Sequence, residues 1–494
     1  MYNEKLKPNQ NLVGATSSRP HFEGITKNHK GITLIALIIT IIVMMILVAV
    51  SVTVALDGGL FSTAKKAASE TELKAEEEML LSAVVGAIGV DAKVDFTKIQ
   101  LPAGFEKTGD KMYESSSGNA FFIGDNGEIE KISRENDTYG IIEVPYEEWS
   151  EELKAAKNEG KITKVLKEVK YGKEYRAVIP VGFEVSIKDD ENTISGGLVV
   201  SDVNGNEFVW VPCTTDKNDE TGLILYAQDK EVRQYKYKEY SDWTDEGGNS
   251  ESVSKYGGFY VGRYEAGIPS NAPFYASADG DTYVKEGRNT TEYIPVSKPN
   301  NPSWNYISQT TSKIVSAAMY SSSVSVQSSL IDSYAWDTIV NWMESKEPTI
   351  VKDSSNYGNY LTSEILLSDA MYSKYIFDCS AWAWTSKPTK YQKGMLEVPA
   401  REWGGEQEIY ELATGASNST KVLNIYDMAG NLWEHTTEVG NWEKGSSAVQ
   451  YVVTRGGSFY NGGADCVINY RYGSRKANDG NQFMDGFRVV LYIK

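Results

Sequence analysis

The sequence predicts an α+β chain with an N-terminal membrane helix, a small β-sheet after it, and then a large domain with little regular secondary structure. Three observations predict this class. Residues 34–56 form one long run without a charged side chain. Residues 57–145 pass from a helical apolar pattern to short strand-like runs. From Tyr171 onward, short β-prone runs alternate with Gly, Asn and Ser turns, and helical patterns are rare.

The uncharged run, residues 34–56, is long enough to cross a membrane. As a helix it would span about 35 Å, which exceeds the apolar thickness of a bilayer. A buried core helix is the alternative, but such helices rarely run so long without a charge. Lys27 and Lys30 precede the run and Asp57 follows it, so the positive-inside rule places the N-terminus in the cytoplasm. We therefore expect a single-pass membrane protein whose body is extracellular.

The residues just before this run, 30–36, resemble the signature that prepilin peptidases recognise in type IV prepilins. The resemblance implies a leader (1–31), cleavage after Gly31 and N-methylation of Ile32. It also implies that the chain meets the membrane, a prepilin peptidase and other pilins, at the cell surface or in a pilus. The family usually has Phe where this chain has Ile32 and Glu where it has Ala36, and the missing Glu argues against routine polymerisation. A signal anchor that is never processed is the alternative.

The stem, residues 32–90, ends in an amphipathic helix and leads into a small pilin-like β region, residues 91–145. Ala75 and Met79 recur at helical spacing, so we expect them on the apolar face of that helix, with the sheet packed against it. Residues 146–170 are rich in Lys and Glu, which predicts a solvated helical linker.

Composition excludes several kinds of site. The net charge of −18 repels phosphate backbones, so no nucleic-acid partner is expected. Only three histidines are present, and His21 and His29 precede the membrane run, so an iron site of several histidines cannot form. The cysteines Cys213, Cys379 and Cys466 never adopt a CxxC spacing, which indicates neither a zinc ribbon nor a disulfide scaffold.

The motifs that carry a second resemblance lie near the C-terminus. Residues 424–434 contain Gly-Asn-Leu-Trp-Glu, residues 455–459 read Arg-Gly-Gly-Ser-Phe, and residues 486–490 read Gly-Phe-Arg-Val-Val. Upstream, residues 208–212 and 256–265 look like the opening strands of the same domain. In this order the motifs resemble the formylglycine-generating enzyme, or sulfatase-modifying factor, family.

This second resemblance implies a C-type-lectin-like fold in an enlarged form over residues 171–494. Residues 330–343 are the main helical pattern in that stretch, because Ile331, Tyr334, Ile339 and Trp342 form an apolar stripe at helical spacing.

The resemblance also implies a structural calcium site in the first C-terminal motif. Two carboxylates and two backbone carbonyls would supply the hard oxygen ligands that calcium prefers. In this chain the matching residues are Asp427, Gly430, Leu432 and Glu434. The alternative is a metal-free turn in which Glu434 pairs with Arg455 or Arg488.

The pair of cysteines that the family oxidase uses for catalysis is incomplete at the matching positions of this chain. The family oxidase holds copper(I) between two cysteines that stand five residues apart, just after the Gly-Gly-Ser motif. Here the second position is Cys466 and the first is Asn461, whose amide cannot replace a thiolate. We therefore expect neither copper nor iron, and Cys466 to serve as a small buried hydrophobe.

What remains is a scaffold that displays a recognition loop between the last two motifs. Tyr and Asn dominate this loop, and they offer flat apolar contact with hydrogen-bonding edges. The candidate ligand-binding residues are Tyr460, Asn461, Asp465, Asn469, Tyr470, Tyr472, Arg475, Asn478, Asp479, Asn481 and Phe483. A merely solvated loop, with Tyr470 and Tyr472 partly in the core, is the alternative.

The sequence thus predicts a surface-anchored, pilin-like protein with a non-catalytic, lectin-like domain that binds an extracellular glycan or protein. One alternative is an extracellular oxidase of the formylglycine-generating type or a related enzyme. A purely structural component of a cell wall or filament is the third possibility.

Overall fold

The computed structural model describes residues 74–89, 93–109, 112–123, 127, 129–131, 141–170, 173–188, 190–219, 221–226, 242–275, 284–378, 383–384, 389–402, 405–444, 447–475 and 477–494. The structure is mixed α and β, with mostly strands and few helices. Contacts divide the chain into two compact units, residues 1–133 and 134–494. Within the described ranges no helix combines the length and apolar composition needed to span a membrane. The predicted leader, with Gly31 and Ile32, and the predicted membrane run lie outside these ranges.

The first unit is a helix over residues 74–85 with a four-stranded antiparallel sheet. Its core contains Leu80 and Val84 from the helix and Phe121 from the sheet. The expected apolar face is wrong, because Ala75 is exposed and Met79 is 45% exposed. Leucine and valine bury more apolar area than alanine, so they set the side that faces the sheet. The strands in order are β1 (Phe105–Gly109), β2 (Met112–Ser115), β3 (Ala120–Ile123) and β4 (Ile129–Lys131).

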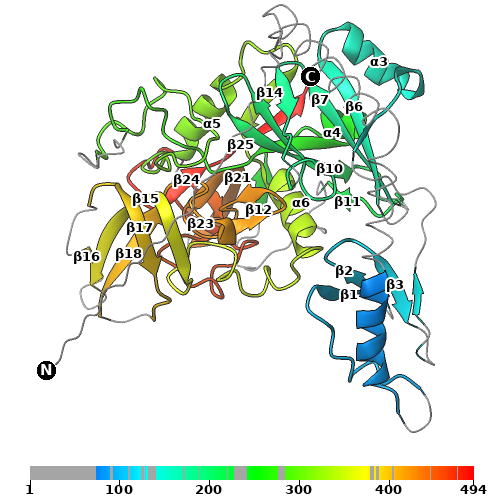
Figure 1. Cartoon of the computed structure of the whole chain (residues 1–494). Coiled ribbons are helices and arrows are strands. Elements are labelled where there is room, and N and C mark those ends of the chain that lie inside the picture. The colour runs from blue at the N-terminus through cyan, green and yellow to red at the C-terminus, as the bar shows by residue number, and fades with distance from the viewer. Residues whose placement is uncertain are drawn as a thin grey trace, which may run out of the picture. The chain divides into compact units, whose positions relative to one another are not determined.

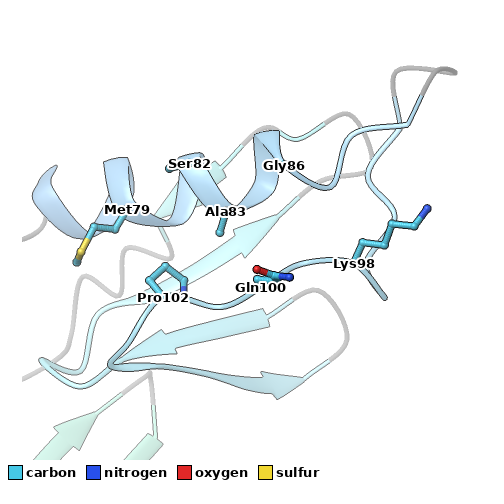
Figure 2. A pocket seen from close by; sticks show the side chains of 7 residues that line it. All are labelled: Met79, Ser82, Ala83, Gly86, Lys98, Gln100 and Pro102. Atoms are coloured by element: carbon cyan, nitrogen blue, oxygen red, sulfur yellow. The ribbon is translucent and has the colours of Figure 1, made fainter.

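The other side of this helix borders a pocket of about 490 Å³ (Figure 2). Met79 lies on the helix and Lys98 on the facing segment, where an ion pair of 2.8 Å joins it to Asp95. The lining residues are Met79, Ser82, Ala83, Gly86, Lys98, Gln100 and Pro102.

The second unit begins with a three-stranded antiparallel sheet and a short helix. The sheet contains β5 (Ile142–Glu143), β6 (Ile162–Lys170) and β7 (Lys173–Pro180), and between β5 and β6 stand a 3₁₀ turn, η1 (Tyr146–Glu148), and α3 (Glu151–Asn158). The Ser150 side chain caps α3 by accepting a hydrogen bond from the backbone N–H of Leu153.

The prediction that residues 146–170 form a solvated linker is therefore wrong. Trp149, Leu153 and Val165 are buried in a core that they share with the larger sheet of this unit. The Lys and Glu residues that suggested a linker lie between these apolar positions. Most of those around α3 are exposed, whereas the lysines of β6 are partly buried and Glu168 is buried. The folded unit accordingly begins before the expected boundary at residue 171.

A seven-stranded sheet forms the centre of the second unit, and the last strand of the chain, β25, lies inside it (Figure 1). Its strands run in the order β14 (Val326–Leu330), β25 (Val489–Ile493), β13 (Gly258–Gly262), β10 (Glu207–Thr214), β9 (Val199–Asp202) and β8 (Phe183–Val185), and β11 (Ile224–Leu225) pairs with β10.

This sheet is buried on both faces. In β10, Phe208 and Trp210 belong to one core, whereas Val209 and Val211 belong to another. Successive side chains of a strand point to opposite faces, so an uninterrupted apolar run is needed when both faces are covered. The expected strands at 208–212 and within 256–265 are thus confirmed as β10 and β13.

The expected helix near residues 330–343 is also confirmed, as α6 (Ser333–Glu344). Asp332 caps its first turn, and Trp336 and Ile339 pack into the second core of the sheet. Two other helices belong to this unit, α4 (Ser250–Tyr256) and α5 (Gln309–Ala318).

Two further sheets and a small ladder carry the C-terminal motifs. The four-stranded sheet contains β15 (Ile365–Asp378), β16 (Ala383–Trp384), β17 (Gln392–Val398) and β18 (Glu406–Leu412). The five-stranded sheet contains β12 (Asp242–Asp245), β21 (Trp433–Lys444), β22 (Ser447–Arg455), β23 (Arg471–Arg475) and β24 (Asp485–Phe487). A 3₁₀ turn, η2 (Asn418–Thr420), precedes the ladder of β19 (Lys421–Val422) and β20 (Ile425–Tyr426).

Candidate functional site

The predicted calcium segment is a tight turn between β20 and β21. Three of its residues have left-handed backbone angles, with φ of 56° at Asp427, 73° at Gly430 and 54° at Asn431. The Asn431 amide holds the turn, because it donates 2.6 Å to Glu265 and accepts 3.0 Å from the backbone N–H of Leu412. A polar side chain with several such bonds offsets the strain of a positive φ at a residue that is not glycine.

Three buried carboxylates, those of Glu265, Asp427 and Glu434, gather around this turn with the guanidinium of Arg488. Arg488 donates to both oxygens of Glu434 at 2.5–3.1 Å. Asp427 accepts 2.8 Å from the backbone N–H of Gly415. The arginine pairing that the sequence left as an alternative is therefore present.

The shared environment disfavours ionisation of these carboxylates. Burial, and then the charges of Asp427 and Glu434, raise the pKa of Glu265 well above its usual value. Burial also raises the pKa of Asp427 and of Glu434, although Arg488 opposes the rise at both. One guanidinium thus faces three carboxylates in a site without contact to solvent.

The predicted calcium ligands all lie in this turn. Asp427 and Glu434 supply buried carboxylates at its two ends, with Gly430 and Leu432 between them. Carboxylates and carbonyls are the hard oxygen donors that calcium takes, but both oxygens of Glu434 already accept from Arg488, and Asp427 accepts from the backbone N–H of Gly415. In the described ranges, no three His, Cys, Asp or Glu side chains are arranged to hold a metal ion.

The two positions that correspond to the cysteine pair of the family lie just after β22. The side chain of Asn461 accepts a hydrogen bond of 2.8 Å from the Ser458 hydroxyl. Cys466 is partly exposed rather than buried, which corrects the expectation of a buried hydrophobe. Cys213 is fully buried in the sheet core, where burial raises the pKa of its thiol, and Cys379 lies outside the described ranges.

Tyr460 and Phe483, two of the predicted ligand residues, belong to a packed aromatic cluster. Tyr460 packs edge-on against Phe377 of β15 with 4.8 Å between the ring centroids. Phe483 packs against Tyr375 of the same strand at 5.4 Å. Both side chains are only partly buried, so the cluster has an accessible margin.

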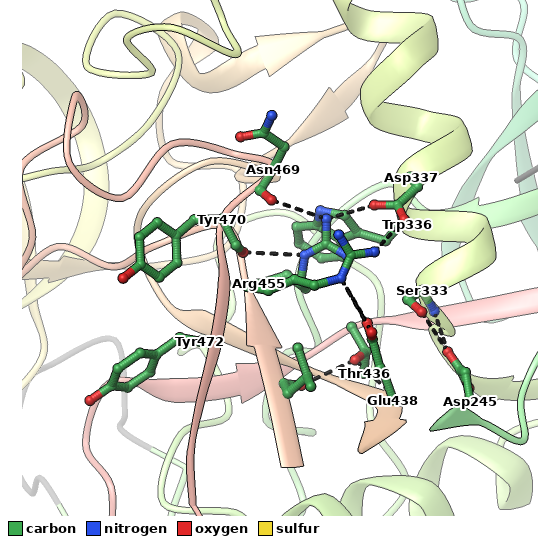
Figure 3. Close-up of polar contacts among 12 residues, drawn as sticks. Asp245, Ser333, Trp336, Asp337, Thr436, Glu438, Arg455, Asn469, Tyr470 and Tyr472 are labelled. Carbon is green, nitrogen blue, oxygen red and sulfur yellow. Dashed lines mark hydrogen bonds and ion pairs between the residues drawn. The ribbon is translucent and has the colours of Figure 1, made fainter. Parts of the chain in front are cut away.

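Tyr470 and Tyr472 form a second aromatic group, on the buried indole of Trp433. The Tyr472 ring stacks on it at 5.2 Å and 28°, and the Tyr470 ring lies at 5.6 Å. Figure 3 shows both tyrosine side chains pointing the same way, away from Arg455 and Asp337. Tyr470 and Tyr472 belong to the predicted recognition loop. They are also partly buried, as the alternative interpretation of the sequence expected.

The polar members of the predicted loop are more dispersed. Asp465, Asn478 and Asn481 are exposed, whereas Asn461, Asn469 and Asp479 are partly buried. Arg475 is the last residue of β23, and its side chain lies outside the described part of the chain.

A buried ion network supports the loop, and the sequence alone did not indicate it. Asp337 of α6 binds Arg455 at 2.7 Å and also pairs with Arg471, which contacts Glu438 at 3.1 Å (Figure 3). Arg455 also donates to the backbone carbonyls of Asn469 (3.4 Å) and Tyr470 (3.2 Å). The signal in the sequence was one arginine in each of two motifs, Arg455 before the two glycines and Arg471 between the tyrosines, but their partner Asp337 stands far away along the chain.

Comparison with known proteins gives one positive result. No curated protein matches the chain. Residues 377–493 match the model of the sulfatase-modifying factor enzyme 1-like domain, FGE-sulfatase, and this stretch contains the turn, the Asn461 and Cys466 positions, and both aromatic groups apart from Tyr375. This stretch of the second unit, residues 377–493, is therefore similar to the sulfatase-modifying factor domain.

Proposed function

We propose that the C-terminal domain has a C-type-lectin-like fold and binds an extracellular ligand without catalysing a reaction. The proposal rests on the side chain of residue 461, which corresponds to the first of the two cysteines in the family oxidase. Asn461 offers an amide there, and its oxygen is already engaged by Ser458. A thiolate pair for copper(I) cannot form from one thiol and one amide. The partly exposed aromatic residues of the same region suit recognition instead.

An oxidase of the formylglycine-generating type is the second candidate, and Cys466 favours it. This thiol is partly exposed and lies in the stretch that matches the family. An oxidase of that type would need a second thiolate beside it.

Replacing Cys466 by serine separates the two candidates. We expect Cys466→Ser to lower the free energy of unfolding by at most about 1 kcal/mol and to leave ligand binding unchanged. Cys213→Ser is the matched control for stability, because it places a hydroxyl at a fully buried position and should cost more.

The functional readouts are a glycan and protein array for binding, and mass spectrometry of a cysteine-containing peptide incubated with copper(I) and oxygen. Alanine variants of Tyr460, Tyr472, Arg475 and Phe483 test the loop, and we expect these variants to bind the ligand more weakly than the wild type. Peptide oxidation that disappears in Cys466→Ser, with loop variants that behave like the wild type, contradicts the proposal.

We further propose calcium as a structural cofactor, held by Asp427, Glu434 and the carbonyls of Gly430 and Leu432. Its binding would stabilise the folded state by about 2.7 kcal/mol at a hundredfold excess over Kd. EDTA should then lower the melting temperature of the wild type, and Asp427→Ala should abolish this response. Equal melting curves with and without EDTA speak against calcium.

The N-terminal part supports a proposal about location: the chain is a single-pass membrane protein with an extracellular body, processed like a prepilin. The supporting observation is the uncharged run at 34–56 behind Lys30 and Gly31. We expect mass spectrometry of protein from native membranes to find N-methylated Ile32 as the first residue. Recovery of the chain with Met1 intact indicates an unprocessed signal anchor instead, and Gly31→Leu should produce that form deliberately.

A further inference from the structure

The strand β8 forms one edge of the seven-stranded sheet. β9 pairs with it on one side, and no other strand in the described ranges pairs with it on the other. The backbone N–H of Ser186 donates 2.9 Å to the carbonyl of Val199, the first residue of β9. Successive residues of a strand turn their backbone groups to alternate sides, so Glu184 also turns toward β9. Phe183 and Val185 therefore turn their N–H and C=O groups toward the open side.

A cleft of about 860 Å³ adjoins this strand edge. Phe183 and Val185 line it from β8, and Thr163 and Lys164 line it from β6. In β6 these two residues precede the part of the strand that pairs with β5. An unpaired strand edge beside a cleft is a template to which an extended peptide can add as a further strand.

Exposed aliphatic side chains gather around the cleft. Val203, in the turn after β9, lines the cleft and is 94% exposed. Val181, which shortly precedes β8, is also exposed. The Ser325 hydroxyl donates 2.8 Å to the carbonyl of Val181, so the exposed side chain of Val324 belongs to the same neighbourhood. Apolar side chains that are exposed together are typical of an interaction surface.

The charges at the cleft select the kind of partner. Glu143, Glu184 and Asp202 line it, but only one lysine does, Lys164. Asp202 already accepts a hydrogen bond of 2.6 Å from Tyr320, whereas Glu143 and Glu184 are exposed. A cationic segment complements these carboxylates. A second copy of this chain, with its net charge of −18, would instead be repelled.

We propose that the edge of β8 binds an extended, cationic peptide segment of another protein, which adds to the seven-stranded sheet as an eighth strand. The backbone groups of Phe183 and Val185 pair with the segment, and its lysine or arginine side chains meet Glu143 and Glu184. Its apolar side chains contact the exposed aliphatic groups around the cleft. This surface lies outside residues 377–493, so the inference is independent of the ligand proposed for the C-terminal loop.

The test measures binding of three labelled decapeptides to the full-length chain, in a nonionic detergent, by fluorescence anisotropy. The first peptide alternates lysine with valine, and the second alternates glutamate with valine. The third repeats the first with methylated backbone nitrogens, which removes its hydrogen-bond donors and keeps its charge. We expect the first peptide to bind, and the other two to bind at least about tenfold more weakly. Hydrogen exchange should slow at residues 181–187 when the first peptide is bound.

Two substitutions in β8 test the edge itself. Val185→Pro removes an N–H that turns away from β9, so it costs no bond of the sheet, and we expect it to weaken binding by about tenfold or more. Glu184→Lys should weaken binding several-fold by reversing a charge at the cleft. Glu397→Lys is the matched control, because Glu397 is an exposed carboxylate on β17, the edge strand of another sheet, and its reversal should leave binding unchanged.

Melting curves show whether each variant is folded, and Glu184→Lys carries the test if Val185→Pro unfolds. Failure of the lysine–valine peptide to bind overturns the inference, and so does equal binding of its methylated form. Self-association that Val185→Pro abolishes, measured by analytical ultracentrifugation, would assign the edge to a second copy and overturn it as well. None of these results bears on the C-terminal loop, whose alanine variants test the proposed function separately.

Discussion

Asp337→Asn is expected to lower the free energy of unfolding by about 3–5 kcal/mol, because it removes the carboxylate that two buried arginines share. Arg455 and Arg471 are fully or almost fully buried, and both donate to Asp337. Asparagine keeps the size of the side chain but leaves the guanidinium groups with only Glu438 as a charged partner in the network. The cost is that of an uncompensated buried charge rather than of a cavity.

The dependence of this effect on pH follows from the pKa of Asp337. Burial alone would raise this pKa, but the charges of Arg455 and Arg471 outweigh it and hold the pKa below its usual value. A carboxyl whose pKa is lowered by folding stabilises the protein above its unfolded pKa and loses that contribution as the pH falls through the folded value. The difference between wild type and variant should therefore be complete at pH 7 and shrink below about pH 4.

Chemical denaturation at several pH values measures the effect, and Glu408→Gln is the matched control. Glu408 forms an ion pair of 2.8 Å with Lys374, but its side chain is 48% exposed, so its loss should cost no more than about 1 kcal/mol. Equal losses in Asp337→Asn and Glu408→Gln contradict the assigned role of the buried network. The Asp337 variant should also bind ligand less well, because Arg455 fixes the backbone of Tyr470.

The sequence predicted the elements whose pattern is local. The apolar run in β10 and the apolar stripe of α6 both specify an element by their own spacing. The prediction for residues 146–170 was wrong because it used the composition of the segment and not the positions of its apolar residues. Their lysines and glutamates are frequent, but Trp149 and Leu153 stand between them and fill a core that the local sequence does not reveal.

The motifs predicted those parts of the candidate site whose interacting residues lie close together in the sequence. The turn before β21 and the aromatic residues after β22 lie in segments that the motifs marked, and their roles as calcium and ligand sites stay predictions. The partners that come from distant segments could not be found. Asp337 and Glu265 stand far from the motif residues in the sequence, and only the fold brings them to Arg455 and Asn431.

The same limit applies to the choice of ligand residues. Tyr460 and Phe483 looked like loop anchors, but the four-stranded sheet brings Phe377 and Tyr375 against them. The sequence did not distinguish Tyr472 from the other candidates, but in the structure its ring stacks on Trp433. Side chains that project from a preformed surface are better candidates for binding energy than those that complete a core.

Gly430→Ala is expected to destabilise the second unit by more than about 3 kcal/mol, because a methyl group cannot be accommodated at the turn. The Cβ atom would lie 2.5 Å from the backbone oxygen of Asn359 and 2.7 Å from its nitrogen. Backbone atoms cannot swing aside like the end of a side chain. The segments around Asn359 and Gly430 lie side by side here and form an isolated parallel β-bridge.

Gly160→Ala separates the steric effect from the backbone angle. Gly160 has φ of 71°, close to the 73° of Gly430, but no atom lies within 4 Å of its Cβ position. It should lose only about 1–2 kcal/mol from the left-handed conformation. Thermal and chemical unfolding of both variants measure the difference, and calcium or ligand binding reports whether the turn survives. If Gly430→Ala proves no less stable than Gly160→Ala, the close contact with Asn359 does not hold the turn, and the hydrogen bonds of Asn431, Arg488 and Gly415 must place Asp427 and Glu434.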